Sequence, residues 1–148
     1  MNYKKVHEML LKEAYKKTPM LITGTFGDYP AVSPDGYRCY IFTLGECFFD
    51  LEALGRRGRH GADFARVVGD TSSYVDAVNS PEVVLDREGK RVLAEIRSAD
   101  VSVWVNDDFL KPFDKDARYM VKDARSAVLV YEDDTLVGFV MPVRKATK

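Results

Sequence analysis

Apolar residues recur at helical spacing at the start of the chain and at strand spacing after it. Residues 3–17 predict an amphipathic helix that ends before Pro19. Its repeating apolar positions are Tyr3, Val6, Met9, Leu10 and Ala14. A different face of the same helix carries Lys5, Lys12 and Lys16. These lysines form either an ordinary solvated face or a stripe that faces phosphates.

From Met20 to residue 51 the pattern predicts an antiparallel meander. The runs "MLITGTF" and "AVSPDGYRCYIFTLG" are rich in β-branched and aromatic residues and are separated by turn sequences. In the second turn, Gly36 suits a positive φ and Asp35 can accept hydrogen bonds from nearby backbone amides. We therefore interpret Asp35-Gly36 as a structural corner between strands, with a catalytic Asp35 as the alternative.

Residues 52–69 interrupt this strand pattern. The segment "GRRGRHG" places Arg56, Arg57 and Arg59 with His60 among three glycines, which predicts a loop or a frayed helix end. Three guanidinium groups on such a loop either remain solvated or bind phosphates bidentately. The following "ADFARVV" can form a short second helix near residues 61–68.

The remainder again predicts β structure. Two apolar runs about a charged turn in 82–96 form a hairpin, and "VSVWV" places Val101, Val103 and Val105 on one face. Asn106 begins a short helical turn that ends before Pro112. A hairpin about residues 132–135 leads into the final strand. The chain is therefore expected to be one α+β domain, residues 1–148, with about eight antiparallel strands and an N-terminal helix.

Composition and charge limit the classes of function. The net charge is −1, with 22 basic and 23 acidic residues, so the chain lacks the overall basic balance of many nucleic-acid-binding proteins. Two cysteines argue against a disulfide scaffold. The sequence has no apolar run long enough to cross a membrane and no apolar signal core. We expect a soluble cytoplasmic protein without a membrane partner.

Residues with catalytic or metal-binding chemistry are sparse. His7 and His60 have no neighbour in sequence that would make either a recognisable general base. Cys39 and Cys47 lie in apolar strand patterns and are expected to be small buried hydrophobic residues. Clustered carboxylates in turns leave a small enzyme as a third hypothesis. We predict no catalytic residue, no metal and no cofactor.

Trp104 lies opposite the valine face of "VSVWV". One face of a sheet must be solvated or bound to something, so Trp104 either packs under a helix or serves as a site for a protein partner.

Parts of the chain resemble a domain of the bacterial DNA polymerase III β sliding clamp. The similar segments are "SVWVNDDFLKPF", where a strand runs into a short helix, the hairpins of residues 118–144, and the corner "AVSPDGYR". The corner matches in part, because Pro34 stands before Asp35. Sliding clamps carry three such domains in a chain and form a ring of six, whereas 148 residues suffice for one domain.

The resemblance implies a non-enzymatic, DNA-clamp-like module that self-assembles or acts as an accessory in replication or mobile-element biology. Its expected partner is duplex DNA, contacted by Lys5, Lys12, Lys16, Arg38, Arg56, Arg57 and Arg59. Segregation of basic from acidic residues on the surface would support this hypothesis. The alternative is a phage- or plasmid-type protein-interaction module that recruits a partner through exposed strands and Trp104.

Overall fold

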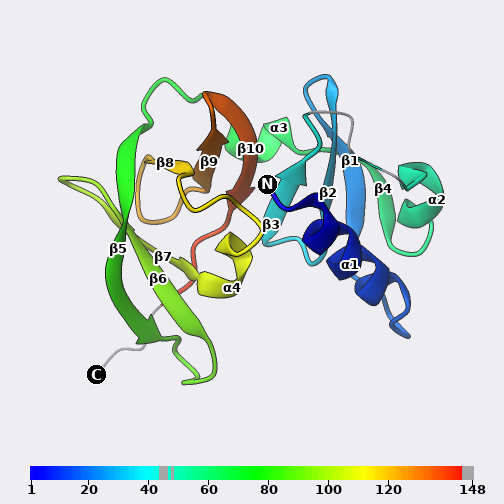
Figure 1. The fold of residues 1–148 in the computed structure, drawn as a ribbon, viewed down its shortest axis with the longest axis horizontal. Coiled ribbons are helices and arrows are strands. Elements are labelled where there is room, and N and C mark those ends of the chain that lie inside the picture. The colour runs from blue at the N-terminus through cyan, green and yellow to red at the C-terminus, as the bar shows by residue number, and fades with distance from the viewer. Residues whose placement is uncertain (44–46, 48, 145–148) are drawn as a thin grey trace.

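The computed structural model of the chain describes residues 1–43, 47 and 49–144. Within these residues, ten strands form a mostly antiparallel sheet in the order β4-β1-β2-β3-β10-β9-β8-β5-β6-β7. Four helices accompany the sheet (Figure 1). The predicted α+β class and antiparallel character are confirmed. The predicted numbers of elements, about eight strands and at most two helices, are too low.

The first part of the chain forms a helix followed by a three-stranded meander. Its elements are α1 (Tyr3–Ala14), β1 (Ile22–Phe26), β2 (Tyr29–Ser33) and β3 (Arg38–Ile41). The Asn2 side chain caps α1 by accepting a hydrogen bond from the Lys5 amide at 3.0 Å. The predicted helix is thus confirmed, although it ends three residues earlier than residue 17.

The last part of the chain also contains a helix followed by a three-stranded meander, and the strand β7 precedes this helix. Its elements are β7 (Ser102–Asn106), α4 (Asp107–Leu110), β8 (Arg118–Val121), β9 (Val128–Glu132) and β10 (Thr135–Val140). Asn106 caps α4 by accepting from the Asp108 amide at 3.1 Å, as predicted. Asp133 and Asp134 both adopt positive φ, which is typical of the tight turn of a two-residue hairpin.

The two meanders meet at their last strands. β3 pairs with β10 in antiparallel fashion, with Cys39 opposite Phe139. The strand order β1-β2-β3-β10-β9-β8 is therefore symmetric about this seam, and each meander has its own preceding helix (Figure 1). The seam joins residues about a hundred positions apart in sequence into the centre of the sheet.

The prediction of a loop in the glycine-rich segment is wrong for Arg59–Asp63. Leu51–Gly55 form α2, but Arg59–Asp63 form strand β4, which pairs with β1 in parallel rather than belonging to a loop. Close backbone approach explains the glycines, because a Cβ on Gly24 would lie 2.0 Å from the Ala62 oxygen and one on Gly58 2.1 Å from the Leu21 oxygen. Helix α3 (Ala65–Val68) confirms the short helix expected near 61–68.

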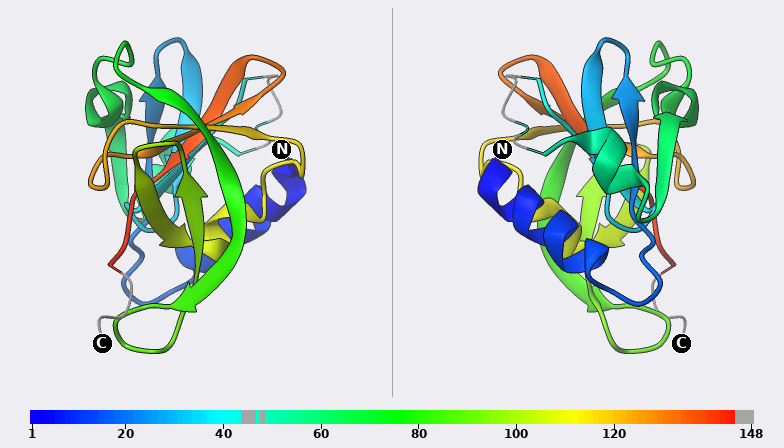
Figure 2. Two further views of the ribbon diagram at one scale, coloured as in Figure 1. Left: turned by 90° about the vertical axis from the view of Figure 1, so that its left-hand side faces the viewer. Right: turned by 90° about the vertical axis from the view of Figure 1, so that its right-hand side faces the viewer.

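The middle of the chain forms a long hairpin. β5 (Val75–Leu85) pairs with β8 near its start and with β6 (Val92–Arg97) along the rest, and its register shifts between Asn79 and Val83. The hairpin predicted for 82–96 is confirmed, but β5 begins at Val75. Beyond β10, the Val143 amide donates to the Trp104 carbonyl of β7 at 2.8 Å. The sheet half from β5 to β10 thus curls back on itself (Figure 2).

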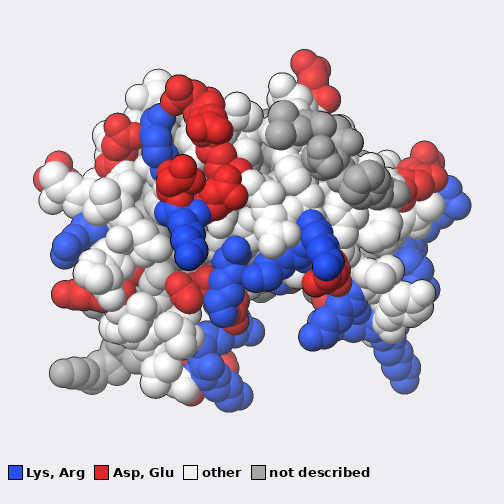
Figure 3. Space-filling view, in the orientation of Figure 1, with Lys and Arg blue, Asp and Glu red and all other residues white. Residues whose placement is uncertain are grey.

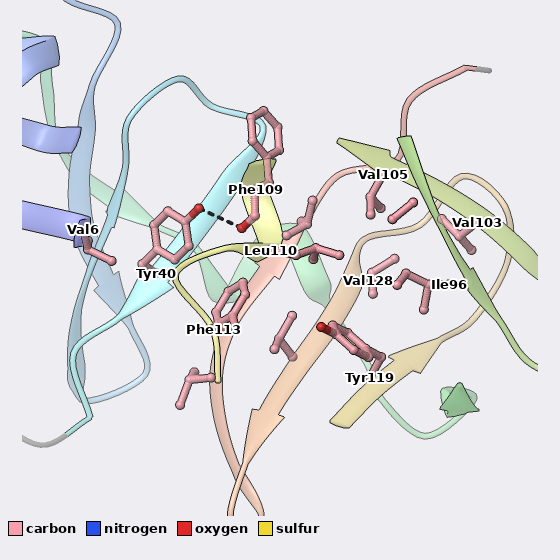
Figure 4. Close-up of a cluster of buried hydrophobic side chains, with 14 of the residues drawn as sticks. Val6, Tyr40, Ile96, Val103, Val105, Phe109, Leu110, Phe113, Tyr119 and Val128 are labelled. Atoms are coloured by element: carbon pink, nitrogen blue, oxygen red, sulfur yellow. Dashed lines mark hydrogen bonds between the residues drawn. The ribbon is translucent and has the colours of Figure 1, made fainter. Parts of the chain in front are cut away.

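A hydrophobic core spans both halves. Val6 and Tyr40 from the first half share one cluster with Ile96 and Val128 from the second (Figure 4). The Tyr40 hydroxyl donates to the Phe109 carbonyl at 2.9 Å, which links β3 to α4. Val103 and Val105 are buried and Val101 packs at the margin, as the alternation of "VSVWV" predicts.

Candidate nucleic-acid interface

A basic groove lies between α1, α4 and the corner that joins β2 to β3. We call it the α1 groove. It is a hollow of about 340 Å³ lined by Lys5, Met9, Lys12, Glu13, Lys16, Pro34, Arg38, Asp108 and Lys111. The Asn2 amide donates to the Pro112 carbonyl at 2.6 Å, so the start of α1 lies beside the end of α4. Three separate stretches of sequence therefore contribute to one surface.

Two lysines of α1, and Lys16 just after it, reach the groove because a different face of the helix is buried. Val6 and Leu10 are completely buried in the core, whereas Lys5, Lys12 and Lys16 are exposed. The predicted lysine stripe is thus brought together, and Arg38 joins it. Lys111, which follows α4, completes the groove and was missed from the sequence, because its position depends on how α4 packs against α1.

Three of the groove's cations have acidic partners three residues earlier in the chain. The ion pairs are Lys16 with Glu13 (2.8 Å), Arg38 with Asp35 (3.1 Å) and Lys111 with Asp108 (2.6 Å). Among the described residues, Lys5 and Lys12 form no such ion pair. These two lysines therefore carry the least compensated positive charge of the groove.

Glu13 is the most buried of these acidic partners. Its carboxylate accepts a hydrogen bond from the Met20 amide at 2.8 Å as well as the ion pair with Lys16. Burial opposes ionisation of Glu13, but the Lys16 ammonium and the Met20 amide outweigh it and hold its pKa below the ordinary value. The carboxylate thus fixes Lys16 at the groove and joins α1 to the segment before β1.

Arg38 lies at the floor of the groove rather than at its rim. Its guanidinium stacks 4.2 Å from the centre of the Phe109 ring, and its side chain is 15% exposed. This position joins β3 to α4. A contact between Arg38 and phosphate stays a prediction.

The corner before Arg38 has the geometry that the sequence predicts. Gly36 has φ +87°, the Asp35 carboxylate accepts from the Tyr37 amide at 3.0 Å, and the Ser33 hydroxyl accepts from the Gly36 amide at 2.7 Å. Asp35 is thus engaged with a backbone amide and with Arg38. The interpretation of Asp35-Gly36 as a structural corner agrees with these contacts.

Two of the predicted arginines lie near the end of α1. We call this second surface the α1-end hollow. It measures about 460 Å³ and is lined by Lys17, Thr18, Pro19, Met20, Leu21, Ile22, Arg57, Gly58 and Arg59. The Arg57 side chain donates to the Ala14 carbonyl at 3.2 Å. Arg56 lines neither hollow.

Trp104 lies on β7 opposite Glu95, away from the core valines. Its side chain is partly buried and its carbonyl accepts the hydrogen bond from Val143. These contacts do not test its predicted role as a binding platform.

Each of the two histidines has an oxygen atom within hydrogen-bonding distance of its Nδ1. His60 Nδ1 lies 2.6 Å from the Thr23 hydroxyl and His7 Nδ1 lies 2.6 Å from the Tyr3 carbonyl. Burial raises the pKa of Cys39 well above its ordinary value, which disfavours the reactive thiolate. Within residues 1–43, 47 and 49–144, no group of three or more His, Cys, Asp or Glu side chains is arranged so that it could hold a metal ion.

On the face of the molecule that Figure 3 draws, the charges are partly segregated. Figure 3 shows acidic side chains gathered over β8 and β9 and basic side chains along the side formed by α1 and α4. The separation is incomplete, since Arg118 lies among the acidic residues and pairs with Asp76 and Asp134. It nevertheless explains how a chain with a net charge of −1 presents a basic surface.

Comparison with known proteins gives no match to a family model, to a curated protein or to a solved structure. In the described part of the chain, every helix is too short or too polar to cross a membrane.

Proposed function

We propose that the chain is a non-enzymatic, DNA-clamp-like module that contacts nucleic acid independently of sequence. The observation that carries the proposal is the convergence of five basic residues from three parts of the chain on the α1 groove. They are Lys5, Lys12, Lys16, Arg38 and Lys111. The two arginines of the α1-end hollow extend this basic surface past the end of the helix.

Binding by these residues would be electrostatic. Lysines that neutralise phosphates release condensed counterions, and this release favours binding whatever the base sequence. Lys5 and Lys12 are seven residues apart, which corresponds to about 10 Å along a helix axis. The acidic partners of the other cations reduce the net charge of the groove. This arrangement suits weak binding along the phosphate backbone of the nucleic acid better than a tight, specific complex.

The clamp-like part of the proposal is supported by element order. β7 runs into the short helix α4 and is followed by the β8-β9-β10 meander, as the resemblance to sliding-clamp domains implies. Self-assembly remains a component of the proposal. β4 has a partner strand on one side only among the described residues, and such an edge is open to pairing with another chain.

The alternative is a protein-interaction module that recruits its partner by strand addition. The hydrogen bond from Val143 already occupies the Trp104 carbonyl on β7, which favours β4 as the strand available for such pairing. An interface of this kind would depend little on salt, whereas phosphate contacts weaken steeply as salt increases.

The test is the salt dependence of binding to a short labelled duplex, followed by fluorescence anisotropy. We expect the affinity of the wild type to fall linearly with salt concentration on logarithmic axes. The double variant Lys5→Gln/Lys12→Gln should reduce this slope by about 2, since each lysine accounts for about one unit. The light-scattering mass of the free chain would report self-assembly in the same samples.

The matched control is Lys90→Gln/Lys122→Gln, which removes two exposed lysines that lie outside the α1 groove. It should leave the slope unchanged. Absence of duplex binding at low salt, or equal effects of the two double variants, would contradict the proposal.

A further inference from the structure

The end of α1 exposes large apolar side chains to solvent. Tyr15 is 83% exposed, Met20 is 61% exposed and Leu11 is 46% exposed. The backbone of Tyr15 is nevertheless fixed, because it is the C-cap of α1 and its amide donates to the Leu11 carbonyl at 3.3 Å. Tyr15 thus presents an aromatic ring from a fixed backbone position.

Basic residues surround Tyr15. Lys12 lies one helical turn before it and Lys16 follows it, and both line the α1 groove. Lys17 lines the α1-end hollow, and Arg57 donates to the carbonyl of Ala14, the residue before Tyr15. Tyr15 itself lines neither hollow, but its neighbours in sequence, Lys16 and Lys17, line one hollow each.

We propose that Tyr15 stacks on an unpaired base of a nucleic-acid strand whose phosphates lie along the α1 groove and the α1-end hollow. This inference rests on the proposed function. Exposed aromatic rings beside a basic groove are the arrangement by which proteins bind single strands without sequence preference, since every base has a π face. Bases within a duplex are already stacked and offer no such partner to Tyr15.

A lipid surface fits these residues less well. Binding in the plane of a membrane needs a broad apolar face on the helix, but the apolar face of α1, with Val6 and Leu10, is buried in the core. Its basic residues also line hollows. Strands with unpaired bases are thus the class of ligand that the site favours.

The test compares binding to a labelled single strand of about twelve nucleotides with binding to a duplex of the same length. We expect Tyr15→Ser to weaken single-strand binding by about 5- to 150-fold, the equivalent of one stacked base, and to leave duplex binding unchanged. Tyr15→Phe should keep the wild-type affinity. The control Tyr29→Ser removes another exposed tyrosine. Tyr29 lies on the β1–β2 hairpin, at the end of β1 that is away from the α1-end hollow (Figure 1).

The outcomes separate this inference from the proposed function. Duplex binding that persists while Tyr15→Ser has no effect on the single strand would overturn the role of Tyr15 alone. Absence of duplex binding by the wild type at low salt would overturn the proposed function, and absence of binding to the single strand as well would overturn this inference. Binding to anionic phospholipid vesicles that depends on Tyr15, without binding to either nucleic acid, would overturn both in favour of a lipid surface.

Discussion

Glu13 illustrates how one residue determines the form of a basic surface. Its carboxylate contacts the Lys16 ammonium and the Met20 amide, which both belong to the segment that follows α1. Only 9% of the side chain is exposed. An acid in the α1 groove thus maintains the positions of neighbouring cations while it lowers their net charge.

Replacement of Glu13 by Gln should lower the free energy of unfolding by about 1 kcal/mol at neutral pH, because a charge-assisted hydrogen bond is weakened. The pKa of Glu13 is lowered in the folded state from its ordinary value of 4.5, so its stabilising contribution is complete above that pH. The contribution is lost as the pH falls through the lower, folded-state pKa. Urea denaturation over a series of pH values measures the difference between wild type and variant.

Glu8→Gln is the matched control for that prediction, since Glu8 is exposed on the same helix. It should change stability much less at neutral pH. A difference between wild type and Glu13→Gln that grows as the solution becomes more acidic would contradict the assigned ion pair.

At the scale of secondary-structure elements, the contact between β1 and β4 depends on the absence of side chains. β4 is a parallel neighbour of β1, and their register shifts between Thr23 and Gly24. Gly24 faces the backbone of Ala62 at a separation that no Cβ can occupy. This pairing positions Arg59 beside the end of α1.

Gly24→Ala should destabilise the protein by about 1–3 kcal/mol, because the added methyl group meets backbone rather than a flexible side chain. Thermal or denaturant unfolding measures the loss. The control is Thr25→Ala at the next position, where the side chain is exposed and no clash arises. Equal stability of the Gly24→Ala variant and the wild type would indicate that β4 does not approach β1 as described.

For the whole molecule, we expect the seam between β3 and β10 and the shared core to make the described residues unfold as a single cooperative unit, and the single domain stays a prediction. Tyr40 is central to this unit, because its ring is buried and its hydroxyl binds the Phe109 carbonyl of α4. Burial raises the pKa of Tyr40 well above its ordinary value of 10.0, so the hydroxyl stays a donor beyond the pH at which an exposed tyrosine ionises.

Tyr40→Phe should lower stability by about 1–3 kcal/mol, since the Phe109 carbonyl loses its donor inside the protein. Trp104, the only tryptophan of the chain, reports on β7, and far-ultraviolet circular dichroism reports on the whole chain. Both signals should shift together to lower denaturant concentration. The exposed Tyr29→Phe serves as control, and two separate transitions would contradict a single cooperative unit.

Local patterns predict much of this fold. The helical period of α1, the cap at Asn106 and the hairpin turns depend on neighbouring residues, and the structure confirms them. β4 was missed because its glycines serve a close contact with β1 that is remote in sequence. The start of β5 was missed because half of residues 75–82 are polar and the segment includes Pro81, which lies where the strand changes register.

The candidate site could be predicted only in part for the same reason. The lysine stripe of α1 follows from helical spacing, and Arg57 and Arg59 were identified by composition. Lys111 and Tyr15 became visible only when α4 and the arginine-bearing segment were seen to pack against α1. Which basic residues share a surface depends on tertiary contacts that a periodic pattern does not encode.

The seam between β3 and β10 also has a consequence for synthesis of the chain. Because β3 pairs with residues 138–140, the edge of β3 that faces β10 has no strand to bind until these residues have left the ribosome. During that interval the first meander exposes a strand edge and the apolar side of α1. Chaperones that bind nascent chains should therefore engage α1 and the first meander until β10 emerges.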